Sequence, residues 1–175
     1  MPPRLRKAVL TAHVATSVGW LGAVVAYLAL DIAAVTGEDT DAVRGAYLAM
    51  DVVVRYAIVP LALATVAIGI VNALGTSWGL FRHYWVVVKL LLTVLAAGVL
   101  LMEARTVARL ADAAASGADP LALPGTLPHS VGGLAVLLVT TAVSVFKPRG
   151  MTRYGWRETQ AGSRTNTPVP PTGTG

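Results

Sequence analysis

Two ionisable residues of this sequence stand inside long apolar stretches, where an ionisable side chain is a candidate for function. His13 lies five residues into the stretch that starts at Ala8, and Lys89 lies five residues into the stretch that starts at Tyr84. If both stretches are helical, both side chains lie about 7–8 Å past the helix start, and so at a similar depth. A neutral imidazole can bind a haem iron or another metal through one ring nitrogen, which makes His13 a candidate ligand.

Both residues also have a structural interpretation, which the sequence leaves open. His13 can be a core histidine that bonds to Ser17 or to a backbone carbonyl of a neighbouring helix. Lys89 can extend its amine to the lipid headgroups while its methylene chain stays in apolar surroundings. Their matched depth is the observation that favours a shared site.

A second set of ionisable residues lies near the other ends of the apolar stretches. It consists of Asp31, Arg55, Glu103 and His129. Arg55 is four residues after Asp51 and can pair with it on one helix face, or it can pair with Asp31 or Glu103 instead. The sequence leaves open whether this outer polar cluster is a structural salt-bridge network or a ligand-binding site.

Four apolar segments must position these residues. The chain is 55% hydrophobic and 13% charged, with a mean hydropathy of +0.65, whereas a soluble domain is typically about 25% charged. We therefore predict an all-α, polytopic membrane protein, a four-helix transmembrane bundle in residues 1–150. The predicted spans are about 8–33, 52–74, 84–107 and 129–146, with an outward extension of the third helix to about residue 115. Pro60 is expected to remove one backbone hydrogen bond and to kink the second span.

Polar and small residues recur at three- and four-residue spacing along every span, so each helix has one such stripe. The stripes are His13, Ser17, Trp20, Val24, Tyr27 and Asp31; Asp51, Arg55, Ala62, Thr65, Gly69 and Asn72; Lys89, Thr93, Ala96, Leu100 and Glu103; and His129, Gly133, Val136, Thr140 with Val143 or Ser144. A four-helix bundle would turn these stripes inward and expose Leu, Val and Ile to lipid.

The charges predict the orientation of the helices in the membrane. Nine of the fourteen basic residues precede the first span, lie between the second and third, or follow the fourth. The segment 36–51, expected to be a loop, is acidic. By the positive-inside rule both termini are cytoplasmic. Residues 151–175 are predicted to be a disordered cytoplasmic tail, because they are rich in Gly, Ser, Thr and Pro.

Composition and motifs exclude several classes of function. Without cysteine the chain cannot hold a disulfide, a Cys-ligated zinc or iron–sulfur site, or a cysteine nucleophile. No His-Glu-x-x-His or P-loop motif occurs, and whether the protein is an enzyme stays undecided. The Gly-x-Ser-x-Gly spacing of residues 75–79 falls in the turn expected at the end of the second span. The net charge of +5 is explained by helix orientation, so no nucleic-acid partner is expected. The expected partner is the lipid bilayer, with a homo-oligomer or a membrane partner protein left open.

Two segments resemble known membrane proteins. LRKAVLTAH (residues 5–13), followed by GWLG (19–22), resembles the first helix of the J-type protoporphyrinogen oxidases and of the copper-resistance D membrane proteins. YWVVVKLLL (84–92) resembles the aromatic-to-lysine start of a helix in the same group. The resemblance implies a b-type haem within a four-helix bundle, with His13 as axial ligand and Lys89 as second ligand or propionate partner. The segment KPRGMTRYGW (147–156) resembles small uncharacterised membrane proteins of high-GC bacteria.

Three functional hypotheses follow. The first is a bundle that binds haem b for redox chemistry or haem handling, with no other cofactor. The second is a non-enzymatic membrane subunit whose polar stripes pack helices or bind a partner. The third is a small transporter or copper permease, in which His13 and the methionines would be metal ligands.

Overall fold

The computed structural model describes residues 1–75, 84–146 and 156, and all regular structure in the two long ranges is helical. The elements are α1 (Pro3–Thr36), α2 (Thr40–Val53), the π-helical turn η1 (Val54–Ile58), α3 (Val59–Leu74), α4 (Tyr84–Ala115), the 3₁₀ turn η2 (Pro120–Ala122) and α5 (Leu127–Phe146). The predicted tail, residues 151–175, lies outside the described residues except for Trp156.

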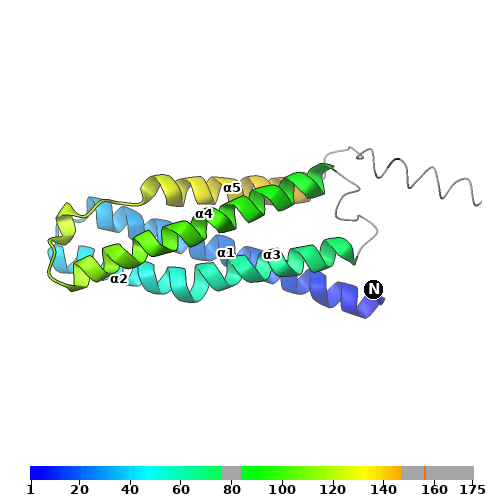
Figure 1. Cartoon of the computed structure of the whole chain (residues 1–175), viewed down its shortest axis with the longest axis horizontal. Coiled ribbons are helices and arrows are strands. Elements are labelled where there is room, and N and C mark those ends of the chain that lie inside the picture. The colour runs from blue at the N-terminus through cyan, green and yellow to red at the C-terminus, as the bar shows by residue number, and fades with distance from the viewer. Residues whose placement is uncertain (76–83, 147–155, 157–175) are drawn as a thin grey trace, which may run out of the picture.

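Because α2, η1 and α3 follow one another without a break, the described chain forms four long helices of 34, 35, 32 and 20 residues. Each is long and apolar enough to cross a membrane, which confirms the prediction of an all-α protein with four long apolar helices. The helices run side by side along the longest axis of the molecule (Figure 1). Both α1 and α4 pack against α2, α3 and α5, so α1 and α4 lie diagonally across the bundle from each other.

The prediction that residues 36–51 form a loop is wrong, because α2 begins at Thr40. The side chain of Asp39 accepts hydrogen bonds of 2.9 Å from the backbone N–H groups of Asp41 and Ala42 and so caps the helix. Acidic residues are favourable in a first turn, where the helix dipole is positive. The helix buries one apolar face against the bundle, made of Val43, Ala46, Tyr47 and Met50.

The sequence around Pro60 produces a π turn. Pro60 has no N–H to donate, and just before it the N–H of Val59 bonds to the carbonyl of Val54, five residues back. Across this turn the buried positions recur at every fourth residue: Met50, Val54, Ile58 and Ala62. The predicted stripe through Arg55 is therefore wrong at that position, since the wider turn places Arg55 on the exposed surface.

The predicted inward stripe of α1 is confirmed. Its buried residues are Trp20, Val24, Tyr27, Asp31 and Ala34. Ala62 and Thr65 of α3 and Thr140 of α5 are also buried as predicted, whereas His129 at the start of α5 is exposed. His129 lies in the first turn of α5.

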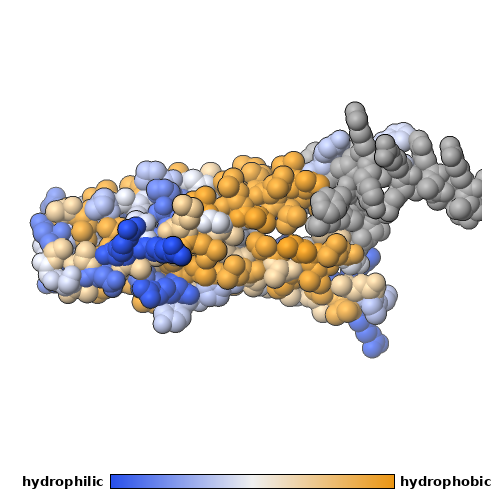
Figure 2. Space-filling model, viewed as in Figure 1, coloured by the Kyte–Doolittle hydropathy of each residue, from blue (hydrophilic) through white to orange (hydrophobic). Residues whose placement is uncertain are grey.

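The outer surface has two zones. Hydrophobic side chains cover the half of the bundle nearer the N-terminus of α1, and hydrophilic side chains gather at the other end, over α2 and the connection from α4 to α5 (Figure 2). Many of the exposed residues on the apolar half are large, such as Leu91 and Leu95 of α4. α4 extends into the hydrophilic end and stops at Ala115, before Gly117 with its positive φ of 96°, in agreement with the predicted extension.

The corner between α1 and α2 provides a test of this packing. A Cβ at Gly37 would lie 2.6 Å from Cγ2 of Val43 and 2.7 Å from the backbone oxygen of Ala33. We expect Gly37→Ala to lower the free energy of unfolding by about 1–3 kcal/mol, measured by circular dichroism in mixed detergent micelles with increasing SDS. Gly45→Ala is the matched control, because a Cβ there meets nothing within 4 Å and alanine favours a helix. Equal stability of the two variants would contradict the structure of the corner.

Candidate functional site

Asp31 is a fully enclosed carboxylate, with 0% of its surface exposed. It accepts three hydrogen bonds from the start of α5. The backbone N–H of Thr126 donates to Oδ1 at 3.1 Å, and the hydroxyls of Thr126 and Ser130 donate to Oδ2 at 2.9 and 2.8 Å. Because the N-terminus of a helix carries partial positive charge, this position favours a carboxylate in addition to the three donors.

Two tyrosines form hydrogen bonds with the segment that connects η2 to α5. The hydroxyls of Tyr27 and Thr126 lie 2.7 Å apart, and the hydroxyl of Tyr47 donates to the carbonyl of Leu123 at 3.2 Å. A Cβ at Gly125 would collide with the side chain of Val35, so the backbone passes directly over α1. The connection before α5 is thus held by α1 on one side and by α2 on the other.

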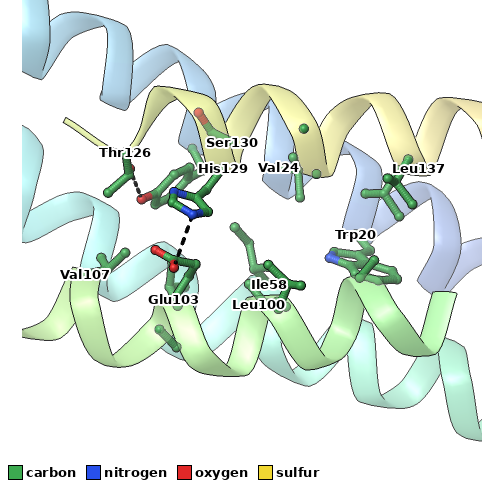
Figure 3. Close-up of a pocket in the computed structure, with 18 of the residues that line it drawn as sticks. Trp20, Val24, Ile58, Leu100, Glu103, Val107, Thr126, His129, Ser130 and Leu137 are labelled. Carbon is green, nitrogen blue, oxygen red and sulfur yellow. Dashed lines mark hydrogen bonds and ion pairs between the residues drawn. The ribbon is translucent and has the colours of Figure 1, made fainter. Parts of the chain in front are cut away.

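A cavity of about 260 Å³ lies beside this network, between α1, η1, α4 and α5 (Figure 3). Its walls are mostly apolar, and most of its polar groups gather at one end. The polar lining residues at that end are Tyr27, Glu103, Thr126, His129 and Ser130. The buried indole N–H of Trp20, which has no hydrogen-bond partner among the described residues, lies toward the other end. The apolar lining includes Trp20, Val24, Ile58, Ala96, Leu100 and Leu137. The cavity is therefore amphipathic along its length.

Glu103 of α4 and His129 of α5 face each other across the polar end of the cavity (Figure 3). Nε2 of His129 lies 3.4 Å from Oε1 of Glu103, a long contact for a hydrogen bond. The Glu103 side chain is 24% exposed and that of His129 is 54% exposed. The pair spans the gap between the two helices, and the mostly exposed histidine is the freer partner.

The structure divides the predicted outer cluster into three separate groups. Glu103 contacts His129, while Asp31 bonds to the donors of α5. Arg55 pairs with Asp51, with Nε and Oδ2 2.7 Å apart, which is the local alternative that the spacing allowed. The sequence analysis missed Thr126 and Ser130. An aspartate on an inward stripe requires buried donors, and hydroxyl residues near the start of the fourth span were the nearest source.

His13 and Lys89 lie on two helices that are diagonal in the bundle. The imidazole of His13 packs on α3, where a Cβ at Gly69 would lie 3.0 Å from its Cε1. Its Nδ1 is buried and has no hydrogen-bond partner among the described residues. Lys89 belongs to α4, diagonally across the bundle from α1, and neither residue lines the amphipathic cavity. α3 covers the Cε1 edge of the imidazole in this structure, and a haem held by His13 and Lys89 stays a prediction.

Metal binding by a cluster is likewise unsupported within the described ranges, where no group of three or more His, Asp or Glu side chains could hold an ion. The fold and the site define an all-helical protein with four long apolar helices and an amphipathic cavity lined by residues of all four. Comparison of the chain with protein-family models, curated proteins and solved structures found no match.

The buried carboxylate gives a stability prediction. Asp31→Ala leaves one backbone N–H and two hydroxyls without their acceptor in a buried position, and we expect a loss of about 3 kcal/mol or more in unfolding free energy. SDS-induced unfolding in detergent micelles, followed by circular dichroism, measures it. Glu38→Ala is the control, because Glu38 is an exposed acid and its removal should change stability little. A small effect of Asp31→Ala would show that the three bonds do not hold α5.

Proposed function

We propose that this chain is an integral protein of a bacterial plasma membrane that crosses the bilayer four times, with both termini in the cytoplasm. The support is the length and hydropathy of the four helices and the basic residues Arg4, Arg6 and Lys7 at the start of α1. The hydrophilic end, which contains the acidic residues around Asp39, would then lie outside the bilayer.

We further propose that the amphipathic cavity binds a small amphipathic molecule that enters from the bilayer. The observation that carries this proposal is the distribution of its lining: polar at the hydrophilic end of the bundle and apolar along the rest. Several lining residues on the facing sides of α4 and α5 are exposed, among them Leu95, Val99 and Gly132. An opening between these helices faces lipid if the chain spans the membrane, so the ligand needs no aqueous route.

The size of the cavity limits the ligand. At about 260 Å³ it lies just below the range of about 300–1,000 Å³ that is usual for small-molecule sites. It suits a molecule of one ring, or the polar end of a longer amphiphile whose chain leaves between α4 and α5. Such a function is nearer to the hypotheses of a non-enzymatic binding subunit or a small transporter than to the hypothesis of a haem protein.

The orientation is testable because the chain has no cysteine. Single cysteines at Ser116, beyond the end of α4, and at Arg4, in the first turn of α1, lie at opposite ends of the bundle. We expect a membrane-impermeant maleimide to label Ser116→Cys in intact cells and Arg4→Cys only after permeabilisation. The reverse pattern, or labelling of both in intact cells, would refute the proposed topology.

Ligand binding is tested by filling the cavity. Ala96→Phe places a phenyl ring in the apolar part, whereas Gly98→Leu, on the same helix, adds a side chain where a Cβ meets nothing within 4 Å. A ligand that binds only the folded state raises the unfolding temperature. We expect 4-tert-butylphenol, a neutral amphiphile of one ring, to raise the midpoint of the wild type and of Gly98→Leu but not of Ala96→Phe. An equal shift in all three proteins would place the binding elsewhere.

A further inference from the structure

Resting on the proposed function, we infer that the ligand of the cavity is a lipophilic organic cation, an ammonium group attached to an aromatic or aliphatic body. Glu103 would receive the positive charge, and the aromatic side chains of Trp20 and Tyr27 would receive the apolar body and the methylene groups next to the nitrogen. The juxtaposition of one carboxylate with two aromatic rings in an apolar cavity carries the inference.

The charge of the lining favours a cation. Among the residues that line the cavity, Glu103 carries the formal negative charge, and neither lysine nor arginine contributes. Its recorded partner in the described chain is His129, at the long distance of 3.4 Å. A carboxylate with little solvent and weakly polar walls attracts a cation more strongly than in water and repels an anion. The lining is thus complementary to a single positive charge.

The aromatic residues are fixed in position. Trp20 is 3% exposed and Tyr27 is 6% exposed, and both lie on the inward face of α1. The hydroxyl of Tyr27 is bonded to Thr126, which holds its ring at the polar end, whereas Trp20 lies toward the apolar end (Figure 3). The faces of aromatic rings attract cations, and quaternary ammonium ligands are commonly bound in this way. A ligand with its cationic head near Tyr27 and its apolar ring near Trp20 would contact both aromatic side chains.

His129 is the side chain that the ligand would replace. It is more than half exposed and reaches Glu103 from the other helix at the edge of the cavity. An ammonium group that enters between α4 and α5 meets this pair first and can take the place of the imidazole. Asp31 is not a competing site, because it is fully buried and its oxygens already accept three hydrogen bonds.

The test uses two probes of the same shape. Benzyltrimethylammonium is the cation, and neopentylbenzene is its uncharged isostere with carbon in place of nitrogen. Binding to the purified full chain in micelles of an uncharged detergent is measured from the shift in unfolding midpoint over a range of probe concentrations. The wild type should bind the cation at least about tenfold more tightly than the isostere, a difference typical of one favourable charge interaction.

Three variants separate the charge from the shape. Glu103→Gln should weaken the cation at least about tenfold and leave the isostere unchanged. Glu38→Gln, an exposed acid at the corner between α1 and α2, should change neither. His129→Ala should retain or strengthen cation binding, because Glu103 loses its partner; a purely structural Glu103–His129 pair would instead weaken both probes in both variants.

Each remaining result has a defined meaning. If Glu103→Gln binds the cation as well as the wild type does, or if the isostere binds the wild type as tightly as the cation, the inference is overturned. Should 4-tert-butylphenol still bind the wild type in that case, the proposed cavity function stands without a cationic ligand. If none of the three probes binds the wild type, the inference and the proposed function both fail.

Discussion

The carboxylate of Asp31 is the group on which the arrangement of the bundle depends. A buried charge costs several kcal/mol unless it is well bonded, and about that much is lost when its partners are removed. Here the partners come from the start of α5, some 95 to 99 residues later in the chain. Their two hydroxyls and one N–H define where α5 begins against α1. Tyr27 of α1 and Tyr47 of α2 bond to the segment that connects η2 to α5. Residues of α1, α2, α5 and the segment after η2 therefore surround Asp31.

The cavity follows from this arrangement. Since α1 and α4 are diagonal partners, the space between them must be closed by side chains from all the surrounding helices. Near the middle of α4 and the start of α5 these side chains are small, as at Ala96, Gly132 and Gly133, and they leave the space partly open. The hydroxyl groups that satisfy Asp31 also line the polar end. One set of residues therefore anchors α5 and gives the cavity its polarity.

The number of long helices and the inward face of α1 were predictable from the sequence, because hydropathy and a strict three- and four-residue spacing determine both. The pairing of Asp51 with Arg55 was one of the local alternatives. The hydrogen bonds of Asp31 to Thr126 and Ser130 were not predictable, because they depend on which helices become neighbours. The haem site of His13 and Lys89 stays a prediction, since equal depth alone does not specify whether two helices are adjacent or diagonal. Residues 36–51 were predicted to be a loop because they are acidic, although they also contain the regularly spaced apolar residues that α2 buries.

The π turn before Pro60 sets the angle between the buried face of α2 and the buried face of α3, which together form the long second helix. Met50 and Ala62 are 12 residues apart, and at 100° per residue an uninterrupted α-helix would point them about 120° away from each other. The π turn takes up roughly one residue, which reduces the difference to about 20°. Both side chains are then buried within the bundle. The extra residue in η1 thus brings the buried face of α2, at the hydrophilic end, into line with the buried face of α3, among the apolar helices. A substitution of side chains alone would not change this angle between the two faces.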